Sequence, residues 1–344
     1  MKKIYFLINS LSSRSGAERI ACQLANYMSS LNYEVVLCSR NTDRKSIAFP
    51  LNETIKVISF NDSLLAMSCF LRTIDQNDIL FIQNMGKLSI FSLLSKLKCK
   101  VLCLEHGPYF AKSTFLKFLI KLLYKKINIL VTITHADALN YKKNVKNIDV
   151  RPIYNASPYS GNDVSYNLES KKIIAIGRLA KEKRFDLLIK AWSKIHEKFP
   201  DWTLEIYGDG DLRKELLGLV NKLNISNINF FSNRADIEEV YKSAAFLVLT
   251  SEFEGLGMVL VEAQTFGLPL VSFDCPNGPR EIITNNIDGF LVENANLDHL
   301  ASVMVQLITS SSLRGQMSQN ALKSSQKFNH TYISHQWLEI LANL

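Results

Sequence analysis

Several features that mark other classes of protein are missing from this 344-residue chain. It has no uncharged apolar stretch of about 18 residues, the length that a membrane-spanning helix needs, so we do not expect it to cross a membrane. Its six cysteines include no Cys-x-x-Cys pair, because Cys99 and Cys103 are four positions apart. This pattern predicts reduced thiols, a cytoplasmic protein and no metal site.

Short-period repeats and low-complexity tracts are also missing, and so is any motif that would read or stack on nucleic-acid bases. The composition, 47% hydrophobic and 21% charged, is that of an ordinary globular protein, and the length is sufficient for two domains. We therefore expect an enzyme or a binding protein with buried cores, and no nucleic-acid partner.

The net charge of +8 is unevenly distributed along the chain. Residues 1–165 hold 22 basic and 11 acidic residues, whereas residues 166–344 hold 18 and 21. This asymmetry indicates that the N-terminal half meets something anionic. On charge alone, nucleic acid, an acidic membrane surface and a phosphorylated acceptor all remain open.

Short apolar runs alternate with helix-length segments along the whole chain. The strand-like runs lie near residues 4–8, 34–38, 55–59, 79–83, 100–104, 129–133, 148–153, 172–176, 202–207, 227–231, 245–249, 269–273 and 289–292. The clearest helical patterns lie at 17–30, 184–198, 211–223, 297–308 and 330–342. Such alternation predicts an α/β protein with parallel sheets covered by helices.

A polar stretch rich in turn formers, residues 154–170, predicts a linker. It divides the chain into an N-terminal domain, 1–153, and a C-terminal domain, 171–328. We expect the last segment, 329–344, to form a helix that packs back toward the N-terminal domain. A ligand site between the domains is the natural expectation.

The most informative segment runs from Glu254 to Glu262. Two glycines, Gly255 and Gly257, stand where a strand-following loop becomes a helix, and Glu262 lies about two turns into that helix. Free amides at a helix start favour an anion such as phosphate, and carboxylates accept hydrogen bonds from ribose or sugar hydroxyls. The combination predicts a nucleotide-sugar site, although a plain helix start is the alternative reading.

Other strand-following turns carry residues suited to phosphate. Arg178 follows Gly177 and offers a planar fork of donors, and Lys183 adds a mobile charge. Gly208 follows another strand, in a turn that lacks the third glycine of a dinucleotide motif. The turn at residues 12–19, which contains Gly16, opens onto a helix and can approach a phosphate or an acceptor.

Two further signals lie in the N-terminal half. His106 ends a strand before Gly-Pro, a position that suits a binding site, although a lone histidine is more often structural and His135 competes. Lys117, Lys121 and Lys125 recur every four residues among Phe and Leu, and so line one face of a helix. This amphipathic helix is expected to contact an anionic membrane; core packing with a solvated lysine stripe is the alternative.

Taken together, these motifs resemble those of the retaining glycosyltransferases of family 4. The resemblance rests on Gly177-Arg178-Leu179 with Lys183, on Glu254-x7-Glu262 and on the turn Ser15-Gly16-Ala17-Glu18. It covers nearly the whole chain, and residues 255–281 look most like bacterial enzymes of capsule, O-antigen or other lipid-linked glycan synthesis. It implies the GT-B fold, two Rossmann-like, doubly wound parallel-sheet domains that face each other across a cleft. The first turn departs from the Gly-Gly-Ala-Glu of many relatives.

The resemblance also implies roles for particular residues. Arg178 and Lys183 would bind the donor diphosphate, Glu254 the donor sugar and Glu262 the ribose. His106 would lie near the reacting centre. The donor would also contact residues that are mostly glycines: Gly16, Gly177, Gly208, Gly255, Leu256, Gly257 and Met258. No Asp-x-Asp motif stands in a suitable loop, so the family's chemistry implies no metal and no cofactor.

The expected function is therefore transfer of a hexose or N-acetylhexosamine from a UDP-sugar, with retention, to a polyprenyl-diphosphate-linked saccharide. The protein would act in bacterial surface polysaccharide synthesis, in the cytoplasm and peripherally bound to the inner face of the cell membrane. Two alternatives are a sugar-nucleotide epimerase of the same fold, which needs no acceptor, and an inactive module that binds glycan or a partner.

Overall fold

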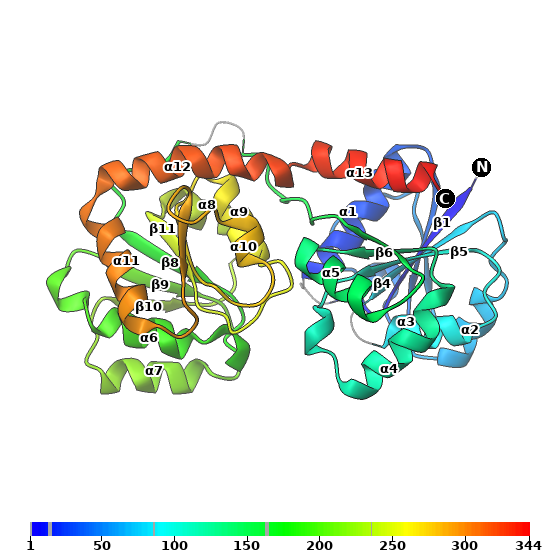
Figure 1. Ribbon diagram of the computed structural model, residues 1–344, viewed down its shortest axis with the longest axis horizontal. Coiled ribbons are helices and arrows are strands. Elements are labelled where there is room, and N and C mark those ends of the chain that lie inside the picture. Colours follow the sequence, from blue (N-terminus) through cyan, green and yellow to red (C-terminus); the bar gives the residue numbers. More distant parts are fainter. Residues whose placement is uncertain (1, 13–15, 85–86, 162–164, 235) are drawn as a thin grey trace. The chain divides into compact units, whose positions relative to one another are not determined.

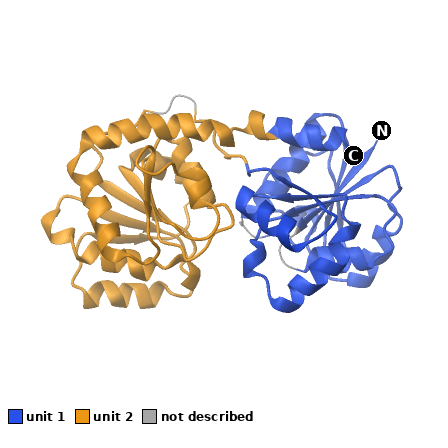
Figure 2. Cartoon of the chain, in the orientation of Figure 1, with its two compact units in different colours: residues 1–155, 334–344 blue, residues 156–333 orange. Residues whose placement is uncertain are grey.

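The structure is a computed structural model, and it describes residues 2–12, 16–84, 87–161, 165–234 and 236–344. The chain divides into two compact units (Figure 2). Unit 1 comprises Met1–Asn155 and Ser334–Leu344, and unit 2 comprises Ala156–Ile333. In the described part of the chain, no helix combines the length and apolarity needed to cross a bilayer.

The described residues of unit 1 form a seven-stranded parallel sheet in the order β3-β2-β1-β4-β5-β6-β7. Its strands are β1 (Lys3–Ile8), β2 (Glu34–Ser39), β3 (Lys56–Ser59), β4 (Ile79–Asn84), β5 (Lys100–Glu105), β6 (Ile129–Thr132) and β7 (Asp149–Pro152). The helices that cover it are α1 (Gly16–Ser30), α2 (Leu64–Leu71), α3 (Leu88–Leu94), α4 (Thr114–Leu123) and α5 (His135–Asn144) (Figure 1). Short 3-10 turns are η1 (Arg44–Ser46), η2 (Tyr109–Ala111) and η3 (Tyr124–Lys126).

Unit 2 contains a six-stranded parallel sheet in the order β10-β9-β8-β11-β12-β13. Its strands are β8 (Lys172–Ile176), β9 (Thr203–Tyr207), β10 (Ile228–Phe231), β11 (Phe246–Leu249), β12 (Leu270–Phe273) and β13 (Gly289–Val292). Its helices are α6 (Phe185–Ser193), α7 (Arg213–Lys222), α8 (Ile237–Ser243), α9 (Met258–Thr265), α10 (Pro279–Ile282), α11 (Leu297–Thr309) and α12 (Ser311–Ser325). The 3-10 turns are η4 (Lys181–Lys183), η5 (His196–Lys198) and η6 (Gln326–Phe328).

The central strands are largely continuous apolar runs because helices cover both faces of each sheet. In β4, the side chains of Ile79 to Ile82 are all essentially inaccessible to solvent. In unit 2, α6 packs on α11 and α9 packs on α12 (Figure 1). The predicted α/β class with parallel sheets is confirmed, and the predicted strands agree with the observed ones to within about a residue.

The segment at residues 154–170 was expected to be a linker, and the boundary between the units lies within it. From Ala156 on, it belongs to unit 2, where the hydroxyl of Tyr166 donates to the carbonyl of Ala245. Residues 162–164 lie outside the described residues. Near the other end of the chain, α13 (His330–Ala342) carries Trp337, whose buried ring lies 5.1 Å from that of Phe81 in unit 1.

Candidate functional site

The candidate site of unit 2 is the place where the strand order reverses. From β8 the chain continues to β9 and β10, which lie on one side of β8 within the sheet. It then returns to place β11 on the other side of β8. Ligands of such sheets bind beyond the carboxyl ends of the two strands that flank this reversal. Arg178 and Lys183 follow β8, and Glu254 follows β11, so the sheet topology brings these predicted residues to one edge.

Lys183 and Glu254 form an ion pair at this edge. The ammonium nitrogen of Lys183 lies 2.6 Å from Oε1 of Glu254, and the hydroxyl of Ser251 donates to the same oxygen at 2.6 Å. The side chains are 21% and 10% exposed, so the two charges are only partly screened by water. The pair therefore places a cation and a carboxylate together at the predicted donor position.

Hydrogen bonds to backbone carbonyls hold the two loops against each other. The hydroxyl of Thr250 contacts the carbonyl oxygens of Lys183 and Arg184, each at 3.1 Å. The amide of Glu252 donates to the carbonyl of Glu182 at 2.8 Å. Arg184 has a left-handed backbone, with φ at +49°, and its guanidinium pairs with Asp186. The position of Lys183 is thus set by the fold.

Arg178 lies on the same loop but is far more exposed, at 71% of its side chain. Its guanidinium lies 2.5 Å from the carboxylate of Glu182, four positions further along the chain. The backbone amide and the Arg178 guanidinium hold the pKa of Glu182 below its ordinary value. Such an exposed pair contributes little to stability, so Arg178 can exchange Glu182 for another anion at low cost.

Glycine is required where the turns after β8 and β9 meet. Gly208 has φ at +149°, and a Cβ atom added to it would lie 1.9 Å from the carbonyl oxygen of Gly177. The amide of Leu179 donates to the carbonyl of Asp209 at 2.9 Å. Gly208 therefore allows the backbone contact that supports the Gly177-Arg178 turn.

The loop after β11 leads directly into α9, as the sequence predicts. Gly257 occupies the N-cap with φ at +90°, and Met258 is the first helical residue. A Cβ atom at Gly278 would lie 2.2 Å from the carbonyl oxygen of Leu256, so the loop after β12 packs tightly on this start. The first amides of a helix have no acceptor within the helix and carry the positive end of its dipole. The start of α9 is therefore suited to an anion.

Glu262 is buried in the second turn of α9, where its Oε2 accepts a hydrogen bond of 2.8 Å from the hydroxyl of Tyr241.

The Cys275 thiol, which follows β12, is not a nucleophile near neutral pH. Burial, and to a lesser extent the Glu254 carboxylate, raise its pKa to about 12. Beyond β12, Arg280 is exposed and pairs with Asp274.

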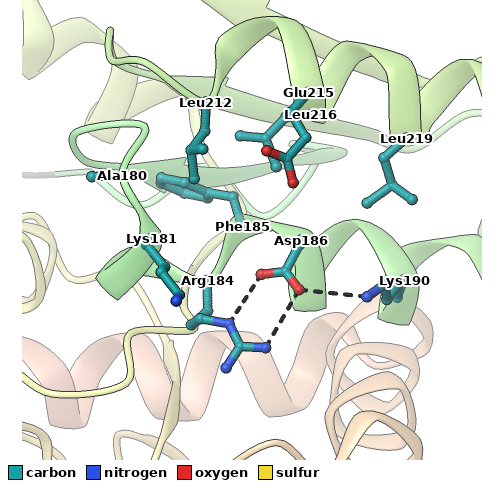
Figure 3. A pocket seen from close by; sticks show the side chains of 10 residues that line it. All are labelled: Ala180, Lys181, Arg184, Phe185, Asp186, Lys190, Leu212, Glu215, Leu216 and Leu219. Carbon is teal, nitrogen blue, oxygen red and sulfur yellow. Dashed lines mark hydrogen bonds and ion pairs between the residues drawn. The ribbon is translucent and has the colours of Figure 1, made fainter.

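A hollow of about 590 Å³ lies beside the Lys183 loop, but it belongs to the groove between α6 and α7 (Figure 3). The residues that line it are Ala180, Lys181, Arg184, Phe185, Asp186, Lys190, Leu212, Glu215, Leu216 and Leu219. Asp186 pairs with both Arg184 and Lys190, at 3.1 and 3.5 Å. The predicted donor residues are not among these, so we assign the site to the loops rather than to this hollow.

In unit 1, His106 lies just after β5 and is held by Gln83, at the end of the neighbouring strand β4. Its Nε2 lies 2.7 Å from Oε1 of Gln83, whose side chain is completely buried. Burial lowers the pKa of His106 to about 4, so the imidazole is neutral at pH 7. A neutral imidazole can exchange protons or hydrogen bonds with a sugar hydroxyl.

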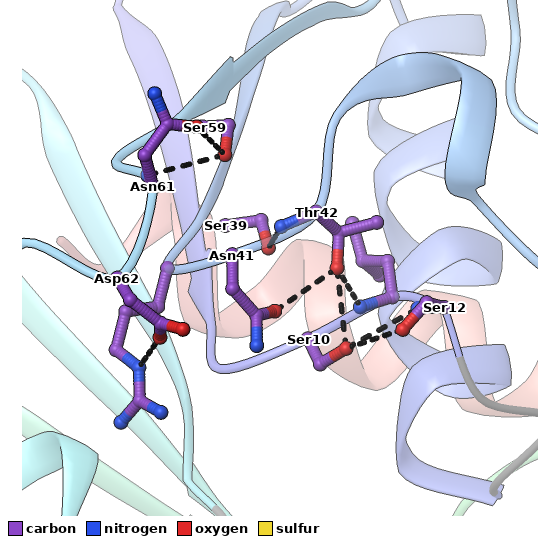
Figure 4. Close-up of polar contacts among 10 residues, drawn as sticks. Ser10, Ser12, Ser39, Asn41, Thr42, Ser59, Asn61 and Asp62 are labelled. Carbon is purple, nitrogen blue, oxygen red and sulfur yellow. Dashed lines mark hydrogen bonds and ion pairs between the residues drawn. The ribbon is translucent and has the colours of Figure 1, made fainter.

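Gly16 begins α1, and the Ser15 before it lies outside the described residues, with Ser13 and Arg14. The turn after β1 starts from Ser10, whose hydroxyl lies 2.9 Å from that of Ser12 and 3.1 Å from that of Thr42 (Figure 4). Figure 4 also shows polar side chains that follow the carboxyl ends of β2 and β3, among them Asn41 and Asn61.

The three lysines that were expected to contact a membrane differ in their contacts and exposure. Lys117 donates to the carbonyl of Phe110 at 2.7 Å and lies over the ring of Tyr109. Lys121 and Lys125 are exposed. The expected stripe is therefore interrupted, because the N-terminal lysine of α4 is engaged by η2.

Sequence reasoning missed the residues that hold the predicted ones in place: Gln83, Tyr241, Thr250 and Ser251. Of these, Gln83 carried a signal in the sequence, since it is a polar residue near the end of an otherwise apolar run in β4. The partners of Glu254 and Glu262 were not accessible in this way, because the contacts of Ser251 and Tyr241 depend on loop geometry and strand order.

Comparisons with known proteins identify the family and the fold. Residues 162–324 match the family described as glycosyl transferases group 1. The chain is 30% identical to the amylovoran biosynthesis glycosyltransferase AmsD of Erwinia amylovora, over 99% of this chain and all of that protein. It is 26% identical, over 100% of this chain and 99% of the relative, to an α-1,4-N-acetyl-D-galactosaminyltransferase of Campylobacter jejuni whose name specifies a diNAcBac-PP-undecaprenol-linked substrate.

A solved structure of a Staphylococcus aureus TarM variant, determined with UDP among its ligands, has a similar fold. Its TM-score is 0.85 at 15% identity, and the similarity covers 98% of this chain and 99% of that one. At this identity the likeness concerns the fold alone.

Proposed function

The chain belongs to the group 1 glycosyltransferases and has their GT-B fold, and from this premise we propose a specific reaction for it. It transfers a hexose or N-acetylhexosamine from a UDP-sugar, with retention and without a metal ion. The acceptor is a saccharide linked to a polyprenyl diphosphate, and the product enters a bacterial surface polysaccharide such as O-antigen, capsule or exopolysaccharide.

The observation that carries the proposal is the placement of Lys183, Glu254 and the start of α9 at one edge of the unit 2 sheet. Breaking the bond between sugar and diphosphate leaves negative charge on the phosphate. Preorganised cations and helix amides stabilise that charge, and such stabilisation is usually the largest single contribution to catalysis. Lys183, Arg178 and the amides of α9 supply these groups from the protein, in the place that a metal ion takes in other transferases.

We expect donor binding to rearrange the charges of the site. The diphosphate competes with Glu254 for Lys183 and with Glu182 for Arg178, and it thereby releases the Glu254 carboxylate to accept hydrogen bonds from the donor sugar. Glu262 takes the ribose hydroxyls. His106, neutral at pH 7, supports the developing reaction near the sugar. The acceptor attacks from the face that the phosphate leaves, and the leaving phosphate assists its deprotonation, so the configuration is retained.

The acceptor class is supported by the relatives. One of them is named for amylovoran synthesis and another for an undecaprenyl-diphosphate-linked substrate. Such acceptors are anchored in the membrane, which agrees with the basic N-terminal half of this chain. We place the protein at the inner face of the cell membrane, on an anionic surface.

Thermal unfolding with a panel of UDP-, GDP- and ADP-sugars, in magnesium or in EDTA, tests the donor. A ligand that binds only the folded state raises its melting temperature. We expect one UDP-sugar to raise it equally in both buffers, and Arg178→Ala to lose that shift while its own melting temperature stays normal. A shift that requires magnesium, or none with any nucleotide sugar, contradicts the donor assignment.

The acceptor is tested by incubating the shifting donor with synthetic polyprenyl-diphosphate-linked saccharides. Transfer to the lipid-linked saccharide, with the anomeric configuration of the donor, is the expected product. Conversion of the donor sugar without any acceptor identifies an epimerase instead.

A further inference from the structure

Large apolar side chains are exposed together on three neighbouring helices of unit 1. They are Leu65 on α2, Phe91 and Leu94 on α3, and Phe115, Phe118 and Leu122 on α4. In the fold, α2 packs on α3 and α3 packs on α4, so these exposed residues come from neighbouring helices of one unit (Figure 1). We call this set the apolar face. Several large apolar side chains exposed on neighbouring helices indicate a contact with a protein or a membrane.

The orientation of α4 shows that its aromatic residues are not core residues. Leu116, Ile120 and Leu123 point inward and are buried. Residues on the opposite side of a helix follow from its 100° turn per residue. In α4 these are Phe118 and Lys121, flanked by Phe115 and Leu122, and the exposed Lys125 follows in η3. Phe115 is 69% exposed and Phe118 is 62% exposed. The helix therefore presents aromatic rings and ammonium groups outward together.

Charge identifies the kind of partner. The segment 87–126, which includes α3 and α4, holds nine lysines and a single acidic residue, Glu105. That carboxylate is buried and pairs with Lys112, so the segment offers no exposed negative charge of its own. A protein partner would need a matching acidic surface of one shape, whereas an anionic bilayer accepts aromatic rings and scattered lysines without a fixed pairing.

A single buried carboxylate anchors both ends of α4. Lys112, just before the helix, lies 2.7 Å from Oε2 of Glu105, and Tyr124, just after it, donates its hydroxyl to Oε1. Ser113 caps the first turn by accepting from the amide of Leu116. The helix is consequently formed and fixed before it meets any partner, so binding does not have to order it.

We propose that the apolar face is a membrane-docking surface, on which Phe115, Phe118 and Leu122 insert into the interfacial layer of an anionic bilayer. Lys121 and Lys125 contact the lipid headgroups at the edge of the inserted rings. With ten residues, α4 is about 15 Å long and lies along the bilayer surface rather than across it. The proposal deepens the proposed function, since it names the surface through which the enzyme reaches a lipid-linked acceptor.

Co-sedimentation with vesicles tests the docking surface on the full chain without nucleotide. We expect the protein to bind vesicles of phosphatidylcholine with phosphatidylglycerol, and the double variant Phe115→Ser, Phe118→Ser to bind roughly tenfold more weakly or worse. Leu139→Ser is the matched control, because Leu139 is 68% exposed on α5 of the same unit and outside the apolar face. It should bind like the wild type.

Insertion itself is measured with Phe118→Trp as a fluorescent reporter, because Trp192, Trp202 and Trp337 are all buried. Brominated lipids should quench the added tryptophan. The proposal is overturned if the wild-type protein does not bind anionic vesicles or if the double variant binds them as well as the wild type. It is also overturned if the Leu139→Ser control loses as much affinity as the double variant. So does a shift from dimer to monomer in the double variant, which would assign the face to a second copy of the chain. These outcomes are separate from the UDP-sugar melting shift, which requires only the unit 2 site.

Discussion

The ammonium group of Lys183 and the carboxylate of Glu254 lie 2.6 Å apart, although 71 positions separate the two residues in the chain. They meet because β8 and β11 are neighbours in the sheet. The pair is where the predicted phosphate-binding loop and the predicted sugar-binding loop come together, and most of what we propose for the reaction depends on it.

Replacing Lys183 with Ala tests this relationship. The change leaves Glu254 partly buried without its cation, so we expect the free energy of unfolding to fall by about 1–3 kcal/mol. Turnover should fall by roughly 100-fold or more, because a group that stabilises the leaving phosphate is lost. Denaturant titration and initial rates measure the two effects.

Lys194→Ala is the control for that variant, since Lys194 forms a comparably short but exposed pair with Asp298. It should change stability by about 0.5 kcal/mol or less and leave turnover unchanged. Equal effects of the two variants would contradict a special role for Lys183.

Gly208→Ala should disturb the Gly177-Arg178 turn. The added methyl group collides with the carbonyl of Gly177, and a side chain is strained at φ of +149°. We therefore expect the free energy of unfolding to fall by about 2 kcal/mol or more. Gly218→Ala in the middle of α7, where a Cβ atom meets no neighbour, should instead stabilise by up to about 1 kcal/mol. If both substitutions are neutral, the turns after β8 and β9 are not packed as described.

Glu105→Gln should strongly lower the stability of unit 1. It leaves the buried ammonium of Lys112 without a countercharge, which costs about 3 kcal/mol or more. Glu34→Gln is the comparison, because Glu34 pairs with Lys3 at 2.8 Å on the surface, and its loss should be small. A mild effect at Glu105 would mean that this carboxylate does not anchor α4.

The lowered pKa of His106 predicts that the stability of the protein depends on pH. Its pKa is about 4 in the folded protein and about 6.5 in the unfolded chain, so the unfolded chain binds the extra proton between these values. The stability that His106 contributes is therefore complete above about pH 6.5 and is lost as the pH falls toward 4, by at most about 3 kcal/mol.

Denaturant unfolding of His106→Gln and wild type across that range measures this contribution. The variant should lose stability less steeply than the wild type as the pH falls. His299→Gln, at an exposed histidine, should follow the wild-type curve. Identical slopes for wild type and His106→Gln would contradict the depressed pKa.

Gln83 should select the tautomer of His106. When the Gln83 carbonyl accepts the hydrogen bond, the proton resides on Nε2 of His106, and Nδ1 is left as the acceptor. Nitrogen NMR of the imidazole should show the Nε2–H form in the wild type and a mixture in Gln83→Leu, with His106→Gln identifying the signal. A dominant Nδ1–H form in the wild type would reverse this assignment.

The strands and the parallel class were accessible from the sequence because strands buried on both faces become continuous apolar runs. The loops that we propose to bind phosphate could be picked out for a related reason. Turns such as Gly177-Arg178 and Gly255-Leu256-Gly257 follow such runs, and only a few residue types suit a close backbone approach beside an anion. The basic amphipathic helix was accessible in outline, through the four-residue spacing of its lysines.

Only the tertiary structure decided which of these side chains meet. Lys183 reaches Glu254, and Gln83 reaches His106, through strand order, and no local periodicity encodes the order in which parallel strands pair. The same holds for α4, where alternating Phe, Leu and Lys fit either a core helix or a surface helix. Burial of Leu116, Ile120 and Leu123 on the sheet side settles which face points inward, and it leaves Phe118 and its neighbours outward.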